Sequence, residues 1–241
     1  MSEIRVRNPV IAKLQHATAL RAEDRAVLEA LTAQAIELPA HAELVREGDC
    51  PPHVHVVLSG FACRYKTLPD GGRQIMAWLT PGDFCDLHVA VLGAMDHAVA
   101  TLSPSRLALL PRNGMEEITD RHPALARAFW WATLVDAAIL REWLVNLGRR
   151  PGEQRIAHLF CELLARLRAT GLAEDGEMDF PLTQADLADT VGLSAVHVNR
   201  IVQDLREAGL IKWRSGRLRI LDVAGLESLA GFNPSYLHLL R

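Results

Sequence analysis

Apolar and polar residues follow three different patterns along the chain. From about residue 36 to residue 112, short apolar runs alternate with turn-forming residues, as in VHVVLSG, FACRYKT, RQIMAWL, AVATLS and RLALLP. The segments between them contain Pro51-Pro52, Ser59-Gly60, Pro69-Asp70-Gly71-Gly72 and Pro81-Gly82-Asp83. Short strands at near-regular spacing, with a hairpin turn at Asp70-Gly71-Gly72, predict a small β-sandwich or β-barrel.

The second pattern is helical. Asn113 and Glu116 can cap a short helix that runs to about Asp120, and Pro123 suits the first turn of another helix. Residues 124–147 then form a long apolar run. Positions about 3.5 residues apart form one stripe of a coiled-coil type: Ala126, Trp130, Thr133, Ala137, Leu140, Leu144 and Leu147.

Other apolar residues of this run lie outside the stripe, among them Phe129, Trp131, Ile139 and Trp143. A helix that is apolar nearly all round must be buried on more than one side. Packing on the β-rich part and on a second copy of the chain satisfies this requirement, although a helix buried inside a monomer gives the same pattern. GRRPG at 148–152 ends the run and predicts a hinge.

The third pattern lies in residues 181–221 and predicts a helix-turn-helix followed by a basic hairpin. Thr183 is a suitable N-cap, and Asp186 three residues later completes a capping box. Ser194 caps the second helix. A helix-turn-helix also needs a small residue at the helix contact, a glycine in the turn and a β-branched residue between the helices, here Ala188, Gly192 and Val198.

The second helix has one apolar and one polar side. Val198, Ile201, Val202 and Leu205 form the side expected to pack on the domain, while the opposite side and its flanks carry Val196, His197, Asn199, Arg200, Gln203 and Glu207. The N-terminal part of such a helix contacts base edges in the major groove, so Val196, His197, Asn199 and Arg200 are the candidates. Arginine pairs with guanine and asparagine with adenine, and a bidentate pair contributes about 1–3 kcal/mol of discrimination.

Residues 211–221 alternate apolar and basic residues around Ser215-Gly216, which predicts a hairpin. Arg217 and Arg219 share one face, and Lys212 and Arg214 add charge on the incoming strand. Such a surface suits phosphate contacts. An ordinary solvated surface has a similar composition, but here it follows the second helix directly. The candidate DNA-binding residues are therefore Thr183, Gln184, Ser194, Val196, His197, Asn199, Arg200, Gln203, Arg214 and Arg217.

Composition limits the class of protein. The chain is 49% hydrophobic and 23% charged, which is typical of a globular protein, and its net charge of −3 restricts any DNA-binding charge to a local patch. The N-terminal MSEIRVRNPV lacks the apolar core of a signal peptide, and we expect no stretch that could span a membrane, which places the protein in the cytoplasm. The four cysteines are scattered without a CxxC pair, so thiols are favoured over zinc or iron–sulfur ligands.

This order of elements resembles the Crp/Fnr family of bacterial transcription regulators. The residues that carry the resemblance are Gly48, Gly60, Gly82-Asp83-Phe84, Asn146-Leu147, Arg155-Ile156-Ala157 and Asn199-Arg200. It implies an α+β protein with a double-stranded β-helix (jelly-roll) sensor domain like those that bind cyclic nucleotides in residues 1–121. A dimerisation helix in 122–148 and a winged helix-turn-helix in 149–241 would follow.

The resemblance also implies partners. The protein would be a homodimer on near-palindromic double-stranded DNA and would act with RNA polymerase. In CAP, a member of this family, the recognition helices enter successive major grooves about 34 Å apart, and the same docking is implied here.

Departures from the family pattern concern the effector. Members that bind cyclic AMP carry Gly-Glu-Leu after Gly-Asp-Phe and a later Arg-Ser pair, where this chain has Cys85-Asp86-Leu87 and Asp96-His97. An anionic phosphodiester needs a cation, so we expect no cyclic nucleotide. The first cysteine is Cys50, which disfavours the iron–sulfur cluster of the oxygen-sensing branch. Val196 replaces a common glutamate, which should favour a thymine methyl over cytosine. The candidate effector contacts are Cys85, Asp86, Leu87, His88, Asp96, His97, Leu140 and Arg141.

His53-Val54-His55 also resembles the His-x-His of cupin metalloenzymes, but the glutamate that cupins add a few residues later is missing. We therefore interpret both histidines as polar strand positions near the mouth of the roll and assign no metal ligand and no cofactor. The sequence favours a transcription regulator without enzymatic activity. Its rivals are a cupin-like metalloenzyme and a DNA-binding protein that responds to no effector.

Overall fold

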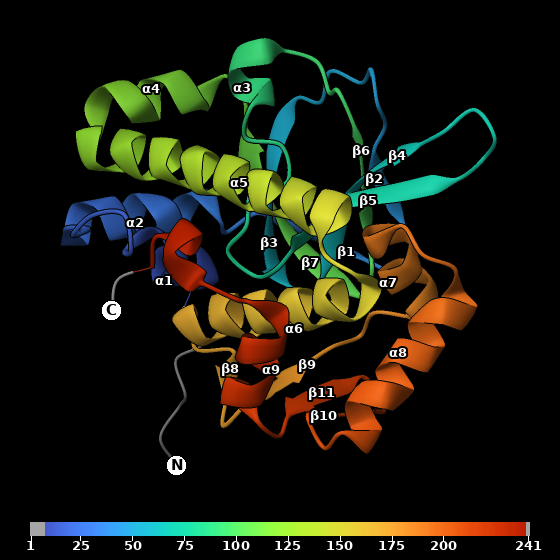
Figure 1. The fold of residues 1–241 in the computed structure, drawn as a ribbon. Helices are drawn as coiled ribbons and strands as arrows, with labels where there is room; N and C mark the ends of the chain where they lie inside the picture. Colours follow the sequence, from blue (N-terminus) through green and yellow to red (C-terminus); the bar gives the residue numbers. More distant parts are fainter. Residues whose placement is uncertain (1–7, 240–241) are drawn as a thin grey trace. The chain divides into compact units, whose positions relative to one another are not determined.

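The structure, a computed structural model, describes residues 8–239 (Figure 1). The first seven residues, on which part of the leader-peptide expectation rests, lie outside this range. The chain forms two compact units. Within the described range, the first contains the residues up to Ala62 and Leu79–Leu134, and the second contains Cys63–Trp78 and Val135–Leu239. Residues 63–78 therefore group with the C-terminal half of the chain.

The first unit is built around two antiparallel strand groups. β7 (Ser105–Pro111) lies between β1 (Ala35–Leu38) and β3 (His53–Ser59), and β2 (Glu43–Val45) pairs with β6 (Ala98–Thr101). The apolar runs at 54–60, 98–103 and 106–111 predicted β3, β6 and β7. The helices of this unit are α1 (Pro9–Leu14), α2 (Ala22–Leu31), α3 (Val89–Leu92), α4 (Gly114–Arg121) and the start of α5.

The core of the first unit lies between β3, β7 and the start of α5. Val54, Val56 and Leu107 are fully buried there. The rings of Phe84 and Phe129 meet edge to face at 5.4 Å, a favourable aromatic geometry. The packing of Phe129 confirms that one side of the long helix covers the β-rich part.

The helix α4 forms as predicted, but its expected cap does not. Asn113 has helical backbone angles, with φ −67° and ψ −18°, and its side chain accepts no capping hydrogen bond from the described backbone. An N-cap residue needs a non-helical backbone to turn its side chain over the first N–H groups. The prediction that Asn113 and Glu116 cap this helix was therefore wrong.

The helix α5 runs from Pro123 to Arg149 and is drawn as one long helix in Figure 1. Its predicted stripe is largely uncovered: the exposed fractions are 68% for Trp130, 55% for Leu140 and 72% for Leu144. Gly148 lies inside the helix, so the break falls at Arg150-Pro151 and is shorter than the predicted 148–152.

By length and composition alone, α5 is apolar enough to cross a membrane. The expectation that no stretch reaches this limit was therefore wrong. The same test is passed by core helices of soluble proteins, and the start of α5 packs on the core of the first unit.

The second unit contains the hairpin of β4 (Ala62–Thr67) and β5 (Arg73–Leu79), except for its two end residues. Its turn closes where Asp70-Gly71-Gly72 predicted it: Leu68 N–H donates to Gly72 O at 2.7 Å, and Gly71 has a φ of +83°. This positive φ favours glycine.

The rest of the second unit contains helices around a small sheet. α6 (Gly152–Ala169), which the sequence analysis missed, is followed by β8 (Ala173–Glu174), β9 (Glu177–Asp179), α7 (Gln184–Val191), α8 (Ala195–Glu207), β10 (Ile211–Arg214), β11 (Arg217–Ile220), α9 (Val223–Ala230) and the 3-10 helix η1 (Pro234–Leu237). The strand order is β10-β11-β9-β8. Phe180 centres an aromatic core, with its ring 5.0 Å from Trp213, 5.4 Å from Phe160 and 5.9 Å from Trp78.

Candidate nucleic-acid interface

The predicted helix-turn-helix is present and begins with a capping box. Asp186 N–H donates to Thr183 Oγ1 at 3.1 Å, and Thr183 N–H donates to Asp186 Oδ2 at 3.0 Å. Gly192 ends α7 in the left-handed conformation, with φ +65°. Ser194 then caps α8 by accepting from His197 N–H at 3.3 Å. Local signals for the two helix starts and the turn are thus confirmed.

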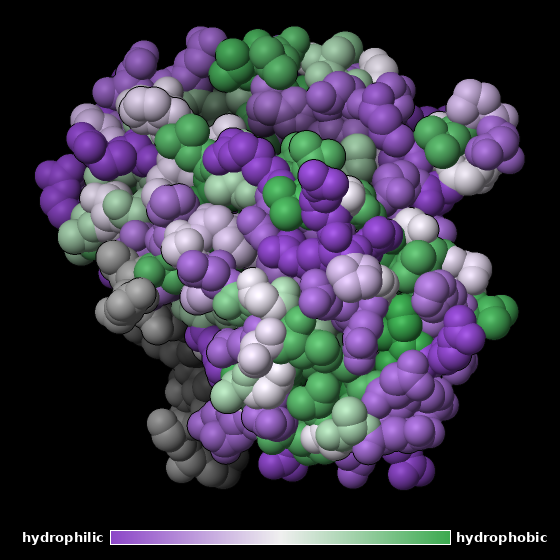
Figure 2. All heavy atoms as spheres, viewed as in Figure 1, coloured by the Kyte–Doolittle hydropathy of each residue, from purple (hydrophilic) through white to green (hydrophobic). Residues whose placement is uncertain are grey.

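The exposed side of α8 carries the candidate base contacts. Asn199, Arg200 and Gln203 are exposed, Val196 is 82% exposed and His197 is half-buried. The residues predicted to face inward, Val198, Ile201, Val202 and Leu205, are all buried. Figure 2 shows mainly hydrophilic residues over α8. The helix therefore presents polar groups and one isolated apolar side chain to solvent.

Two of the candidate DNA contacts are bonded to each other. Asn199 Nδ2 donates to Gln184 Oε1 at 2.9 Å, so the start of α7 orients the amide of Asn199. Thr183 uses its hydroxyl for the cap, accepting from Asp186 N–H and donating to its carboxylate at 2.7 Å. The sequence pattern placed these residues correctly on the helices but did not show that they hold one another.

The hairpin of β10 and β11 gathers four cations on one face. Lys212 lies opposite Arg219, and Arg214 lies opposite Arg217. These four residues line one surface pocket together with Ser215 and Glu177. Leu218 and Ile220 point the other way and are buried. The alternation predicted from sequence is confirmed, and the cluster of cations suits an anion such as a phosphate.

Two acidic residues of β9 lie beside this cluster of cations. Their position next to the hairpin was not predicted from the sequence. Arg217 Nε donates to Glu177 Oε1 at 2.6 Å, and its Nη1 donates to Asp179 Oδ1 at 3.2 Å. Both carboxylates lie outside the sequence of the hairpin, on β9, which pairs directly with β11. Arg206 of α8 is also engaged, because it donates to Trp213 O and so connects α8 to β10. The polar-apolar-polar alternation of Glu-Met-Asp at 177–179 could have indicated this strand from the sequence, and Met178 is indeed buried.

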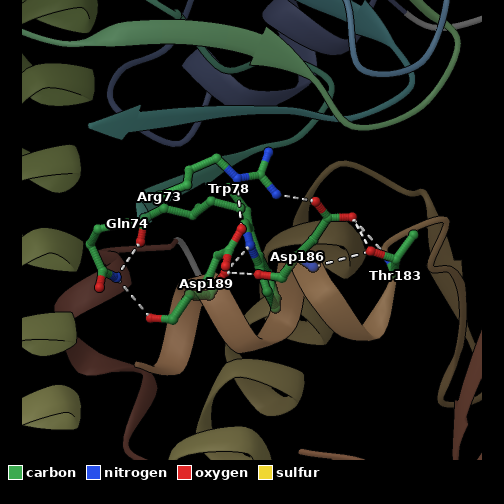
Figure 3. A network of polar contacts seen from close by, with 8 residues as sticks. Arg73, Gln74, Trp78, Thr183, Asp186 and Asp189 are labelled. Atoms are coloured by element: carbon green, nitrogen blue, oxygen red, sulfur yellow. Dashed lines mark hydrogen bonds and ion pairs between the residues drawn. The ribbon is translucent and has the colours of Figure 1, made fainter. Parts of the chain in front are cut away.

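The hairpin of β4 and β5 holds α7 through a polar network (Figure 3). Arg73 donates from Nη2 to Asp186 Oδ1 and from Nε to Asp189 Oδ2, each at 2.7 Å. Trp78 Nε1 donates to Thr190 Oγ1 at 2.9 Å, and Gln74 Nε2 donates to Thr190 O at 3.2 Å. Three side chains of one hairpin therefore fix the helix that precedes α8.

The carboxylate of Asp186 takes part in both the helix cap with Thr183 and the ion pair with Arg73. Burial raises its pKa, but hydrogen bonds from Thr183 and the Arg73 guanidinium outweigh burial and hold the pKa below its ordinary value. Arg73 and Asp186 are 113 positions apart in the chain. No local motif links residues at such a distance, which is why the sequence analysis missed the pair.

Arg155, one of the residues that carried the family resemblance, connects the hinge to α7. Its Nε donates to Arg150 O at 2.9 Å and its Nη1 donates to Val191 O at 2.7 Å. Asn146 Nδ2 in turn donates to Arg155 O at 3.2 Å. The carbonyls at the ends of helices have no partner within the helix, so these bonds stabilise the break after α5 and the end of α7.

The candidate effector residues divide into buried and accessible ones. Asp86 is fully buried and accepts from His55 N–H at 2.6 Å, while its Oδ2 lies 2.5 Å from His55 Nδ1. His55 is thus buried inside the first unit, whereas His53 is half-buried and lines a surface pocket, so the two histidines do not share one environment. Cys85 is buried and its N–H donates to His55 O at 2.8 Å.

The remaining effector candidates are more accessible, except for one histidine. Leu87 and His88 are half-buried, Asp96 is exposed and His97 is buried. Asp96 Oδ1 lies 2.6 Å from His97 Nδ1 and 3.7 Å from His88 Nε2, so these three residues come together. Leu140 and Arg141 are exposed on α5, in the second unit.

Comparison with known proteins identifies two domains in the chain. Residues 154–229 match the Crp-like helix-turn-helix domain, and residues 35–122 match the cyclic nucleotide-binding domain. The chain is 30% identical to the transcriptional activator protein FnrL of Cereibacter sphaeroides over 198 residues, which cover 78% of this chain and 79% of that protein. The chain belongs to the Crp/Fnr family of transcription regulators.

Two further similar proteins agree with this assignment. A probable transcriptional activator of Rhizobium leguminosarum is 28% identical over 80% of each chain. The structure of FixK2 from Bradyrhizobium japonicum matches with a TM-score of 0.73 and 25% identity, covering 81% of this chain and 96% of that one. The predicted fold is therefore confirmed, and the protein is a transcription regulator with a DNA-binding helix-turn-helix. Regulators of this family are soluble proteins that bind DNA and act as dimers.

Proposed function

We propose that this Crp/Fnr regulator binds a near-palindromic operator as a homodimer, inserts α8 into the major groove, and responds to a signal bound by its first unit. The exposed polar side of α8 carries this proposal, because its N-terminal half presents Asn199 and Arg200 beside the exposed Val196. These are the side-chain types that contact adenine, guanine and the thymine methyl. The cations of the β10–β11 hairpin would contact flanking phosphates.

The uncovered stripe of α5 supports the homodimer. Trp130, Leu140 and Leu144 expose more than half of their surface, at the 3.5-residue spacing of a coiled coil. The face of α5 seen in Figure 2 carries both hydrophobic and hydrophilic residues, as a seam between charged flanks requires. Two such helices would cover each other's stripe.

The signal is proposed to be other than a cyclic nucleotide or an iron–sulfur cluster. The carboxylate of Asp96 is 78% exposed and would repel a cyclic phosphate at the place where the family pattern has arginine. For the same protein we propose a cytoplasmic location, RNA polymerase as a partner and no enzymatic activity. These proposals rest on the relatives, which are transcription regulators.

Selection of bound sequences from random DNA tests the proposal and yields the half-site. On that site, Arg200→Ala should abolish specific binding and leave weak, salt-sensitive binding to any DNA. Arg217→Ala should weaken binding to all sequences alike and reduce the salt slope by about one. Arg121→Ala removes an exposed arginine of α4 and is the charge control. Unchanged specific affinity of the Arg200 variant would refute the proposed role of α8.

A further inference from the structure

Two histidines and an aspartate meet on the surface of the first unit, in the loop between β5 and β6. One ligand atom each from His88, Asp96 and His97 lies within 4.8 Å of the other two. Asp96 Oδ1 lies close to both imidazoles, and the two rings are 5.2 Å apart with an interplanar angle of 43°. An ion bound at about 2.0–2.2 Å from each ligand atom requires only small shifts of these side chains.

We propose that His88, Asp96 and His97 bind one divalent transition-metal ion. In the sequence these three residues were candidate effector contacts, and no metal ligand was assigned among them. The proposal goes beyond the proposed DNA-binding function and is tested without DNA.

The backbone holds both ends of this loop in place. At its start, Asp86 is fixed to β3 by the backbone and ring of His55. Near its end, Met95 N–H donates to Asp49 O at 2.9 Å and Met95 O accepts from Gly48 N–H at 2.8 Å. Ligands on an anchored loop lose little conformational entropy when they bind an ion.

The turn between the ligands is fixed as well. α3 ends at Leu92 and is followed by Gly93, whose φ of +89° favours glycine, and Arg112 Nη1 donates to Gly93 O at 3.3 Å. The helix turn and this arginine keep His88 and Asp96 on the same side of the loop.

A buried nitrogen atom of His88 is suited to coordinate the ion. His88 Nε2 is buried and makes no hydrogen bond to any residue in the described part of the chain. An unpaired buried polar group is costly, and coordination to an ion would satisfy it. A plain hydrogen-bonded His–Asp pair accounts for the contact of His97 with Asp96, but His88 Nε2, at 3.7 Å from Asp96 Oδ1, is too far away to share that hydrogen bond.

The donor set selects the class of ion. Two imidazoles and one carboxylate suit Zn²⁺, Fe²⁺, Co²⁺ or Ni²⁺, whereas Mg²⁺ and Ca²⁺ prefer oxygen ligands alone. Three protein ligands leave further coordination positions open. Because Asp96 is 78% exposed, these positions face water, and a small molecule could occupy them.

The test is a Co²⁺ titration of the full-length, untagged protein after treatment with a chelator, followed by competition with Zn²⁺ and with Mg²⁺. We expect one Co²⁺ per chain with visible ligand-field absorption, displacement by Zn²⁺ and no displacement by Mg²⁺. Asp96→Asn, His88→Ala and His97→Ala should each weaken binding at least about tenfold. His41→Asn is the control, because His41 is exposed and asparagine tolerates its φ of +58°.

Circular dichroism of each metal-free variant shows whether it is folded. Asp96 is mostly exposed, so Asp96→Asn should keep the fold and decides the matter if a histidine variant does not. Equal affinity of Asp96→Asn and the wild type would overturn the proposal, as would loss of binding in His41→Asn alone. Effective competition by Mg²⁺ would assign the signal to nonspecific carboxylate binding and would also overturn it.

Discussion

Replacement of Arg73 by alanine removes both ion pairs between the β4–β5 hairpin and α7. The partners differ in exposure: the Asp186 side chain is 1% exposed, and the Asp189 side chain is 33% exposed. After the change, Asp189 can be hydrated again. Asp186 remains buried, but it keeps its hydrogen bonds from Thr183 and so is not left without any partner.

These environments set the size of the effect. A hydrogen bond to a buried charged group contributes about 1.5–3 kcal/mol, and a half-exposed ion pair contributes about 0.2–1 kcal/mol. We therefore expect Arg73→Ala to lower the free energy of unfolding by about 2–4 kcal/mol at pH 7. Arg121→Ala, which breaks only an exposed pair with Glu117, should change it by less than about 0.5 kcal/mol.

The effect should depend on pH in one direction. The folded-state pKa of Asp186 lies below its ordinary value of 3.8, so the ionised carboxylate stabilises the fold above pH 3.8, and this stabilisation is lost as the pH falls through the folded-state pKa. The difference in the free energy of unfolding between the wild type and Arg73→Ala should therefore be largest near neutral pH and should decrease in acid. Urea unfolding at one fixed protein concentration measures both. A loss below about 0.5 kcal/mol at pH 7, or a difference in the free energy of unfolding that grows as the pH falls below 3.8, would refute this reasoning.

Three further results are expected. Burial, with nearby positive charge, lowers the pKa of His158 from 6.5 to about 4, so only the unfolded chain takes up this proton between these values. His158→Gln should therefore flatten the loss of thermal stability from pH 6.5 to 4, and a slope like that of the wild type would contradict this. Gly60→Ala should lower the free energy of unfolding of the first unit by more than about 2 kcal/mol, because φ at this position is +80° and the new Cβ would lie 2.3 Å from Pro104 O. An unchanged urea midpoint would show that the turn can relax. Leu144→Glu should give a folded monomer in sedimentation, whereas Leu172→Glu, also at an exposed leucine, should not; a dimeric Leu144 variant would exclude the stripe as the interface.

The parts of the fold that the sequence predicted are those determined by neighbouring residues. The Thr183 cap, the Gly192 turn and the Ser215-Gly216 hairpin each depend on bonds within a few residues, so their signals lie within a few letters of sequence. β1 and β2 were missed because strands of four and three residues are too short to show an alternating pattern.

The contacts that tertiary structure creates could not be predicted in this way. The acidic partners of Arg217 come from a separate strand, and the meeting of His88 with Asp96 and His97 depends on how one loop is anchored at both ends. Asn113 shows the converse error, since a residue suited to capping adopts helical angles when the chain continues the turn. Local preference is overridden wherever the backbone path is set by distant packing.

The carboxylates of Glu177 and Asp179 have a consequence for how the regulator searches the chromosome. A basic hairpin without them would bind any DNA phosphate strongly, and the protein would spend long periods at wrong sites. Here a DNA phosphate that binds Arg217 must compete with the carboxylates of Glu177 and Asp179, and not only displace water. If the hairpin contacts DNA as proposed, the protein dissociates sooner from DNA outside the operator. The phosphate contacts are then weak everywhere, and the base contacts of α8 determine the preference for the operator.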